Sequence, residues 1–161
     1  MEKMYKTVVT GTGNRYDYER ANQHHGELFS QKVKAKDMPS IESAFIDANH
    51  CGCCLHYSMA LFKLLREAGI DAYISITMEE NPITHEMTDN HVSVYYIKDG
   101  KEYIADPVET VKSGKGEYFD IPIQEYYENN GTIWIYDPYG EYGEELFYQG
   151  FLNHPLETFK G

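Results

Sequence analysis

Residues 50–69, HCGCCLHYSMALFKLLREAG, contain the strongest helix pattern in this chain. Over residues 55–68, apolar side chains occupy nearly every face of the predicted helix, which is typical of a helix that is buried on all sides. Gly69 stands where a left-handed residue commonly follows the last helical turn. We therefore expect a buried central helix that begins near residues 52–54, with Cys54 at its amino end.

The segments before the central helix predict a strand and two helices. Residues 7–10 are expected to form a short strand that ends in a turn at 11–14. Residues 15–34 are expected to form a polar helix with a break at Gly26. A short apolar-striped helix then follows, for which Ser40 is the expected N-cap.

The segments after the central helix predict an antiparallel sheet. Strands are expected at 72–78, 91–98, 101–106 and 132–136, and a helix at 121–130. The acidic segment 79–90 is expected to be a surface loop that borders the functional site. Helices thus precede an antiparallel sheet, and this order predicts an α+β fold in a single domain over residues 1–161.

A predicted hairpin brings a histidine and an aspartate together. The Asp-Gly dipeptide at 99–100 is a strong signal for a two-residue type I′ turn, because both residues tolerate positive φ. The resulting register pairs Ser93 with Asp106 and makes His91 a diagonal neighbour of Asp106, about 7–8 Å away between Cα atoms. That separation lets the imidazole and the carboxylate form a hydrogen bond. Asp137, which also ends a strand, is the alternative partner that this register disfavours.

Three side chains of the sequence are of the kinds that form an activated thiol: a cysteine, a histidine and an aspartate. Cys54 lies at the start of the central helix, where the helix dipole and a nearby imidazolium lower the pKa of a thiol. His91 is the candidate base, and Asp106 is the candidate carboxylate that orients the imidazole. The backbone N–H of Cys54, together with Asn49 or His50 just upstream, is the candidate donor set for an oxyanion.

The same residues resemble a known family. The segment Gly52-Cys53-Cys54, followed by Ser58, the helix residues 64–66 and 69–70, His91 and the run 104–107 (Ile-Ala-Asp-Pro), is similar to the transglutaminase-like branch of the papain-type cysteine enzymes. The resemblance covers roughly residues 52–107. It implies an α+β fold with a recognisable core at about 40–140, in which a Cys at the start of a buried helix faces a His and an Asp on an antiparallel sheet.

The resemblance also implies a class of activity. Members of the superfamily include cysteine peptidases, amidases and protein cross-linking acyltransferases, together with relatives that have lost activity. The expected reaction is attack by Cys54 on an amide or peptide carbonyl through a thioester, with His91 and Asp106 completing a catalytic triad. The alternative is an inactive binding module that uses its acidic, tyrosine-rich C-terminal third as an interaction surface.

The charge pattern limits the partners that we expect. The formal net charge is −12, and no Lys or Arg occurs between Lys115 and Lys160. A negative surface opposes binding to nucleic acid and favours a basic protein or peptide substrate. No apolar run is long enough to cross a membrane, and the polar start lacks a secretory signal, so a cytoplasmic location is expected. The sequence leaves the oligomeric state open.

The three cysteines lie too close together for a disulfide scaffold. Cys51, Cys53 and Cys54 occur within four positions, which favours a reduced compartment and a local chemical role. Cys51 and Cys53 either tune Cys54 or pack in the core. A zinc site over residues 50–56, which add His50 and His56 as ligands, is disfavoured because adjacent cysteines do not easily share a tetrahedral ion. No metal and no cofactor are therefore expected.

Overall fold

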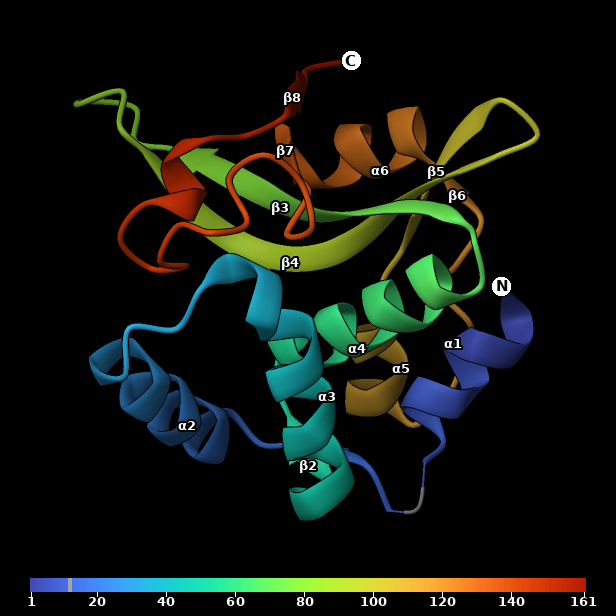
Figure 1. Ribbon diagram of the computed structural model, residues 1–161. Helices are drawn as coiled ribbons and strands as arrows, with labels where there is room; N and C mark the ends of the chain where they lie inside the picture. The colour runs from blue at the N-terminus through green and yellow to red at the C-terminus, as the bar shows by residue number, and fades with distance from the viewer. Residues whose placement is uncertain (12) are drawn as a thin grey trace.

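The computed structural model describes residues 1–11 and 13–161, which form a layer of helices packed against one face of a sheet (Figure 1). The sheet has six strands in the order β6-β5-β4-β3-β7-β8 and is antiparallel throughout. Helix α6 covers the other face of the sheet. The elements are α1 (Glu2–Val9), β1 (Arg15–Tyr16), α2 (Tyr18–Ser30), η1 (Ala35–Asp37), α3 (Met38–Asn49), β2 (Cys51–Gly52), α4 (Cys54–Glu67), β3 (Asp71–Glu80), β4 (Met87–Lys98), β5 (Lys101–Ala105), α5 (Pro107–Ser113), β6 (Ile121–Pro122), α6 (Ile123–Asn130), β7 (Ile133–Tyr136), η2 (Phe151–Asn153) and β8 (Glu157–Phe159).

The predicted central helix is confirmed as α4. Leu61, Phe62 and Leu65 are fully buried in it, and the helix packs between the sheet and the helices α1, α3 and α5. Gly69 adopts the expected left-handed conformation, with φ of +79°. Neither α4 nor another helix in residues 1–11 and 13–161 has the length and apolar character that crossing a membrane requires.

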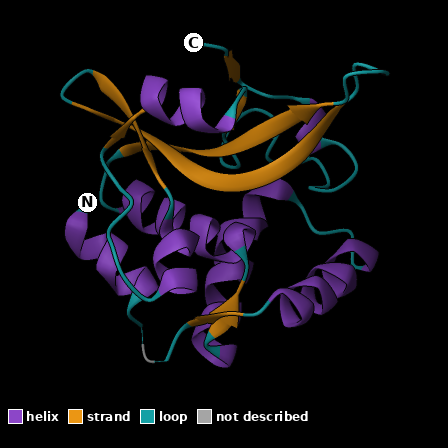
Figure 2. Ribbon diagram, turned by 180° about the vertical axis from the view of Figure 1, so that it is seen from behind, coloured by secondary structure: helices purple, strands orange, loops and turns teal. Residues whose placement is uncertain are grey.

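The sheet separates two apolar cores, as alternation along β4 requires. Val94 and Tyr96 join the large core on the α4 side, whereas Tyr95 joins the smaller core beneath α6. The predicted hairpin register is confirmed, because Lys98 pairs with Lys101 across the turn. Helices, the antiparallel six-stranded sheet and a separate parallel pair of short strands, β1 and β2, confirm the α+β class (Figure 2).

The N-terminal segment differs from the prediction. Residues 7–10, expected as a strand, lie at the end of α1, because Tyr5, Val8 and Val9 form one buried face at helical spacing. The turn expected at 11–14 includes a residue outside the described ranges. The β-branched residues suggested a strand, but packing of this face against α4 and α5 favours the helix.

Two helix starts also differ from the prediction. Helix α2 begins at Tyr18 rather than near residue 15, because the Asp17 side chain accepts the Arg20 N–H at 3.0 Å and caps it. The helix continues through Gly26 without the expected break. Helix α3 begins at Met38, so Ser40 lies inside the helix and is not its N-cap.

The segment between β3 and β4 is shorter than predicted. Cross-strand pairing continues to Glu80 and Met87, so the loop expected over 79–90 is reduced to residues 81–86. Helix α5, which was not predicted, starts directly after β5 with Pro107 in its first turn. Proline suits that position because the missing N–H would have no partner there.

Removing a buried α4 side chain tests the central place of this helix. We expect Leu61→Ala to lower the free energy of unfolding by about 2–5 kcal/mol, since it leaves a cavity where the leucine is fully buried. Leu156→Ala is the matched control, because Leu156 is 63% exposed and its truncation is expected to change stability by about 0.5 kcal/mol or less. Urea unfolding measures the free energy of unfolding of both variants. An equal loss of stability in the two variants would contradict the assignment of α4 as the core helix.

Candidate functional site

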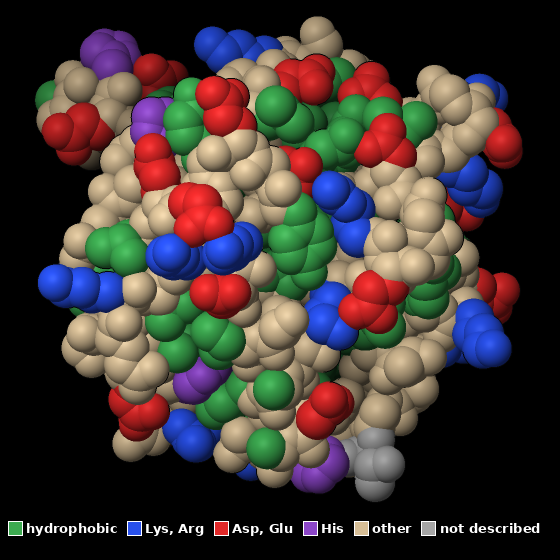
Figure 3. All heavy atoms as spheres, viewed as in Figure 1, with side chains coloured by type: hydrophobic (Ala, Val, Ile, Leu, Met, Phe, Trp, Pro, Cys, Tyr) green, Lys and Arg blue, Asp and Glu red, His purple; other side chains and the backbone are tan. Residues whose placement is uncertain are grey.

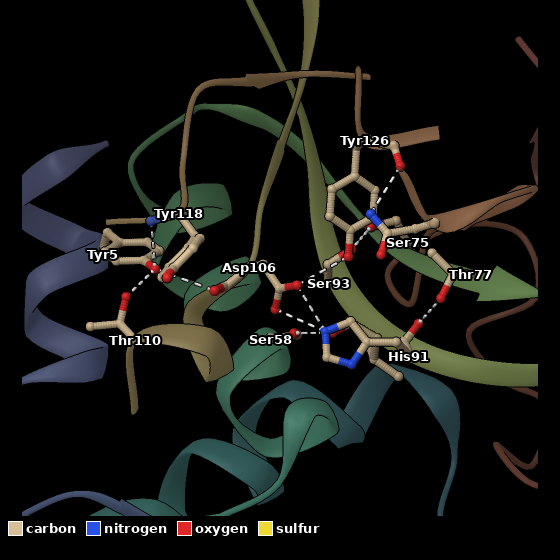
Figure 4. A network of polar contacts seen from close by, with 12 residues as sticks. Tyr5, Ser58, Ser75, Thr77, His91, Ser93, Asp106, Thr110, Tyr118 and Tyr126 are labelled. Carbon is tan, nitrogen blue, oxygen red and sulfur yellow. Dashed lines mark hydrogen bonds and ion pairs between the residues drawn. The ribbon is translucent and has the colours of Figure 1, made fainter. Parts of the chain in front are cut away.

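The structure brings His91 and Asp106 into direct contact, as the hairpin register predicts (Figure 4). His91 Nε2 lies 2.9 Å from Asp106 Oδ1 and 2.8 Å from Oδ2. Asp106 is only 4% exposed, so this contact provides most of the compensation for burying its charge. The second ring nitrogen of His91, Nδ1, points away from Asp106 (Figure 4).

Two irregularities of the backbone place this pair. Thr77 pairs with His91, but the next pair joins Met78 to Asp89, so Asn90 is an extra residue in β4. Such a bulge bends the strand and redirects the neighbouring side chain. Asp106 follows the last residue of β5 and occupies the N-cap position of α5. His91 therefore lies next to an interruption of the β3–β4 pairing, and Asp106 lies just beyond the end of the β4–β5 pairing.

A buried chain of hydroxyl groups leads to the Asp106 carboxylate from the α6 side (Figure 4). Tyr126 in α6 donates its hydroxyl hydrogen to Asp106 Oδ2 at 3.0 Å. Ser93 hydrogen-bonds to Tyr126, and the Ser75 and Ser93 hydroxyls lie 2.6 Å apart. Burial and the Asp106 charge raise the pKa of Tyr126, so this phenol stays a proton donor to the carboxylate.

Tyr5 in α1 holds the backbone at Asp106. Its hydroxyl donates to the Asp106 carbonyl oxygen at 3.2 Å and accepts the Tyr118 N–H at 3.0 Å. The same hydroxyl lies 2.7 Å from Thr110 Oγ1 in α5. Tyr5 is fully buried, so α1 contributes a fixed support to the site that the sequence did not indicate.

The Asp106 charge determines the protonation of His91. Burial lowers the pKa of His91, but the hydrogen bond and the charge of Asp106 outweigh burial and hold the pKa above its ordinary value. In the neutral form, the proton stays on Nε2 facing the carboxylate, and Nδ1 carries the free lone pair. His91 is thus arranged to accept a proton at Nδ1.

His91 and Asp106 line a cavity of about 670 Å³. Its wall also carries Glu109, Glu117 and Glu125, and neither Lys nor Arg is among the lining residues. The cavity is open and its wall is mainly polar, so it can admit a solvated group next to His91. Asp106 is paired with His91 and Glu117 Oε1 lies 3.5 Å from Lys6 Nζ, so Glu109 and Glu125, which form no ion pair within the described residues, give the wall its negative potential.

Cys54 lies at the amino end of α4, where prediction places the nucleophile. The backbone of Val92, the residue after His91, lies beside the Cys54 side chain. Within the described residues, no hydrogen bond joins Cys54 to His91, and Cys54 is not among the residues that line the His91 cavity. The structure therefore places the Cys54 thiol beside β4, close to His91 in the chain, but shows no contact between the thiol and the His91 imidazole.

The acidic thiol is Cys53, whereas the prediction assigned the lowered pKa to Cys54. The neighbouring Cys54 thiol and the His25 and His56 imidazoles lower the pKa of Cys53, despite its burial. The neighbouring Cys53 thiol, together with burial, raises the pKa of Cys54. The sequence could not reveal this difference, because His25 comes from a distant helix.

Close packing around His56 explains the neighbouring glycine. Cys53 is the N-cap of α4, and its N–H and sulfur lie 3.2 Å and 3.6 Å from His56 Nδ1. A Cβ at Gly52 would lie 2.7 Å from the His56 Cβ, so a side chain there would displace the histidine. Cys51 is buried in β2, and all three cysteines are free thiols.

The candidate oxyanion donors upstream of Cys54 are already engaged. Asn49 Nδ2 donates to the Phe45 carbonyl oxygen at 3.0 Å, and the His50 N–H donates to the Ile46 carbonyl oxygen at 2.7 Å. His50 also lines a separate cavity of about 470 Å³. The structure thus does not bring Asn49 or His50 to His91.

The alternative carboxylate is committed elsewhere. Asp137 accepts a hydrogen bond from Arg66 Nη1 at 3.0 Å. Asp106, not Asp137, is therefore the acid that contacts His91, in agreement with the register argument.

A second cluster of titratable side chains was missed by the sequence analysis. His24, His25, Glu42 and His56 place one donor atom each within 4.8 Å of one another. Of the residues considered for zinc at 50–56, only His56 belongs to this cluster. His91, Asp106 and Glu109 form another such group, in which Nε2 of His91 is already paired with the Asp106 carboxylate. The adjacent pair His24-His25 in a polar helix is the only signal that the sequence offered.

Comparisons with known proteins do not assign the chain to a family. No protein-family model matches it, and no curated protein is similar enough to it to count as a relative. The resemblance carried by residues 52–107 therefore remains a prediction, and the functional interpretation depends on the geometry of the site.

Replacing Asp106 tests the electrostatic control of His91. Its folded-state pKa lies above the ordinary value of 6.5, so protonated His91 stabilises the fold below pH 6.5 and this contribution is lost as the pH rises through the raised pKa. We expect Asp106→Asn to lower the pKa of His91 and to remove that pH dependence from the unfolding free energy. An NMR titration of the imidazole measures the shift.

Asp99→Asn is the control for the same change of charge. Asp99 lies in the hairpin turn with φ of +53°, a conformation that Asn also tolerates. At about 3.3 Å per strand residue, the turn is more than about 20 Å from His91 along β4. An equal shift of the His91 pKa in both variants would contradict the direct role of Asp106.

Proposed function

We propose that this protein is a thiol-nucleophile enzyme that acts on amide or peptide carbonyl groups through a thioester. The observation that carries the proposal is the His91–Asp106 pair, whose carboxylate binds Nε2 and leaves Nδ1 turned away from it. Cys54 supplies the nucleophile from the neighbouring helix end. A papain-like arrangement of the transglutaminase-like type is part of this proposal.

His91 first accepts and then returns a proton in the proposed reaction. His91 Nδ1 accepts the proton of the Cys54 thiol while the sulfur forms a bond to the carbonyl carbon. The tetrahedral oxyanion collapses to a thioester as the carbon–nitrogen bond breaks, and His91 returns the proton to the leaving amine. Water or a second amine then attacks the thioester and releases Cys54.

Backbone N–H groups at the start of α4 support the oxyanion. The first N–H groups of a helix have no intrahelical partner, and Cys54 is the first residue of α4. The Cys54 N–H is therefore the donor that we assign to the oxyanion.

The cavity beside His91 favours a basic protein or peptide substrate. On the face shown in Figure 3, acidic side chains lie among Lys and Arg side chains, so the negative charge is not gathered into one patch on that face. The cavity wall, in contrast, carries Asp106, Glu109, Glu117 and Glu125 without a lining cation. A Lys or Arg beside the scissile bond gains most from this field. Three free thiols agree with a reduced compartment, and we place the protein in the cytoplasm.

Thiol labelling tests the nucleophile. We expect iodoacetamide at neutral pH to modify Cys54 before Cys51 and Cys53, because His91 removes its proton as the sulfur reacts. His91→Gln is expected to slow this labelling several-fold, and Cys54→Ser to abolish it. Peptide mapping by mass spectrometry identifies the modified cysteine.

His85→Gln is the matched control for that experiment, since His85 lies in the β3–β4 loop with its side chain 75% exposed. It should leave the labelling rate unchanged. Preferential labelling of Cys53, or a rate that His91→Gln does not alter, would contradict the catalytic assignment. Slow and equal labelling of all three cysteines would favour the inactive binding module.

Substrate charge gives an independent test of the cavity. Of two peptidyl chloromethyl ketones that differ only in carrying Lys or Glu beside the reactive group, we expect the Lys form to inactivate the protein faster. Added salt should reduce the difference, because it screens the carboxylates. Glu125→Gln should also reduce the difference between the two inactivation rates. Glu157→Gln, which changes a residue on β8 outside the cavity, should leave that difference unchanged. Equal rates for the two reagents would contradict a preference for basic substrates.

A further inference from the structure

Three helices direct nitrogen and oxygen atoms to one point next to His56, whose Nδ1 lies 3.6 Å from the Cys53 sulfur. His24 and His25 come from α2, Glu42 from α3 and His56 from α4. His24 Nδ1 lies 2.8 Å from His56 Nε2, and His56 Nε2 lies 2.7 Å from Glu42 Oε2. His25 Nε2 lies 2.7 Å from the other carboxylate oxygen, Glu42 Oε1. One donor atom from each of the four side chains lies within 4.8 Å of the others.

The Glu42 carboxylate is buried without enough hydrogen bonds. Glu42 and His56 have side chains with no exposed surface, and those of His24 and His25 are 12% and 14% exposed. Glu42 Oε2 lies 2.7 Å from His56 Nε2, but that nitrogen is also 2.8 Å from His24 Nδ1, and Glu42 Oε2 accepts no well-aligned hydrogen bond within the described residues. A buried carboxylate oxygen without a partner is costly unless a cation compensates it.

The spacing of these atoms suits a small metal ion. A tetrahedral zinc ion with bonds of about 2.0–2.2 Å holds its ligand atoms roughly 3–3.5 Å apart. The separations here are 2.7 Å, 2.8 Å and, between His24 Nδ1 and Glu42 Oε2, 3.7 Å, which bracket that range. Binding one ion requires His24 and Glu42 to move slightly away from His56 Nε2, and His24 Nδ1 and Glu42 Oε2 to move slightly closer together.

Stacking fixes the orientation of the rings. His25 and His56 stack with centroids 4.3 Å apart and planes at 13°. His24 stacks on Phe45 with a centroid distance of 4.0 Å. On the far side of its ring, His56 Nδ1 accepts the Cys53 N–H at 3.2 Å and lies 3.6 Å from the Cys53 sulfur.

We propose that His24, His25, Glu42 and His56 form a binding site for a divalent transition-metal ion, with Zn²⁺ as the ion that suits them best. Imidazole nitrogens with one carboxylate suit zinc, whereas calcium and magnesium require oxygen ligands. Four protein ligands close the coordination sphere, which is typical of a structural zinc site.

The position of α2 explains what such an ion does for the fold. Helix α2 lies at the outer edge of the helix layer in both views (Figure 1, Figure 2). Only Ala21 and Leu28 of its thirteen residues are buried, so apolar packing holds it weakly. An ion bound by two residues of α2, one of α3 and one of α4 joins α2 to the core. None of the four ligands takes part in the proposed thiol reaction, so metal binding and thiol labelling test the two proposals separately.

Metal reconstitution tests the site. The purified protein is treated with a chelator, dialysed, and then supplied with Zn²⁺ or Co²⁺ alone. We expect stoichiometric zinc by plasma mass spectrometry and a higher melting temperature with Zn²⁺ than without it. With Co²⁺ we expect the visible absorption bands of a four-coordinate ion, without the near-ultraviolet band of a thiolate ligand.

Substitutions identify the ligands. Glu42→Gln and His24→Gln are each expected to lose stoichiometric metal and the zinc-dependent rise in melting temperature, and His24→Gln spares the two fully buried side chains if Glu42→Gln fails to fold. His154→Gln, which changes a half-exposed histidine outside the cluster, should keep both properties. Substoichiometric zinc in the wild-type protein, an unchanged melting temperature, or a thiolate band that Cys53→Ser removes would each overturn the proposed ligand set.

Discussion

Burial of α4 between the sheet and the other helices is the constraint on which the candidate functional groups depend. Leu61, Phe62 and Leu65 are fully removed from water, so the helix has one favourable position along and across the sheet. That position places its amino end, with Cys53 and Cys54, between β4 and the helices α2 and α3. Both polar clusters of the protein meet the core at this helix end.

The two clusters use buried carboxylates in different ways. Asp106 is hydrogen-bonded by His91 and Tyr126, and its imidazole partner lines an open cavity. Glu42 is fully buried among three imidazoles, and one of its oxygens has no hydrogen bond within the described residues. The first arrangement suits proton exchange with a molecule that enters from solvent. The second arrangement suits a metal ion that remains bound inside the protein.

Adjacent cysteines connect these clusters. The Cys53 sulfur lies against His56, while the Cys54 side chain lies beside the Val92 backbone on β4. The two thiols are neighbours at the helix end, and the Cys54 thiol and the imidazoles near Cys53 make Cys53 the acidic member of the pair. A change in the histidine cluster therefore alters the charge next to Cys54, and this coupling follows from the sequence order Cys-Cys at one helix end.

The sequence by itself determined the features that depend on local spacing. Apolar residues around the whole of 55–68 required a buried helix, and the Asp-Gly turn set the register that joins His91 to Asp106. Tertiary packing decided the rest. Val8 and Val9 favour a strand locally, but their burial against other helices makes them part of α1. The histidine cluster joins residues 17 and 32 positions apart on separate helices, and no local periodicity encodes which of their faces meet.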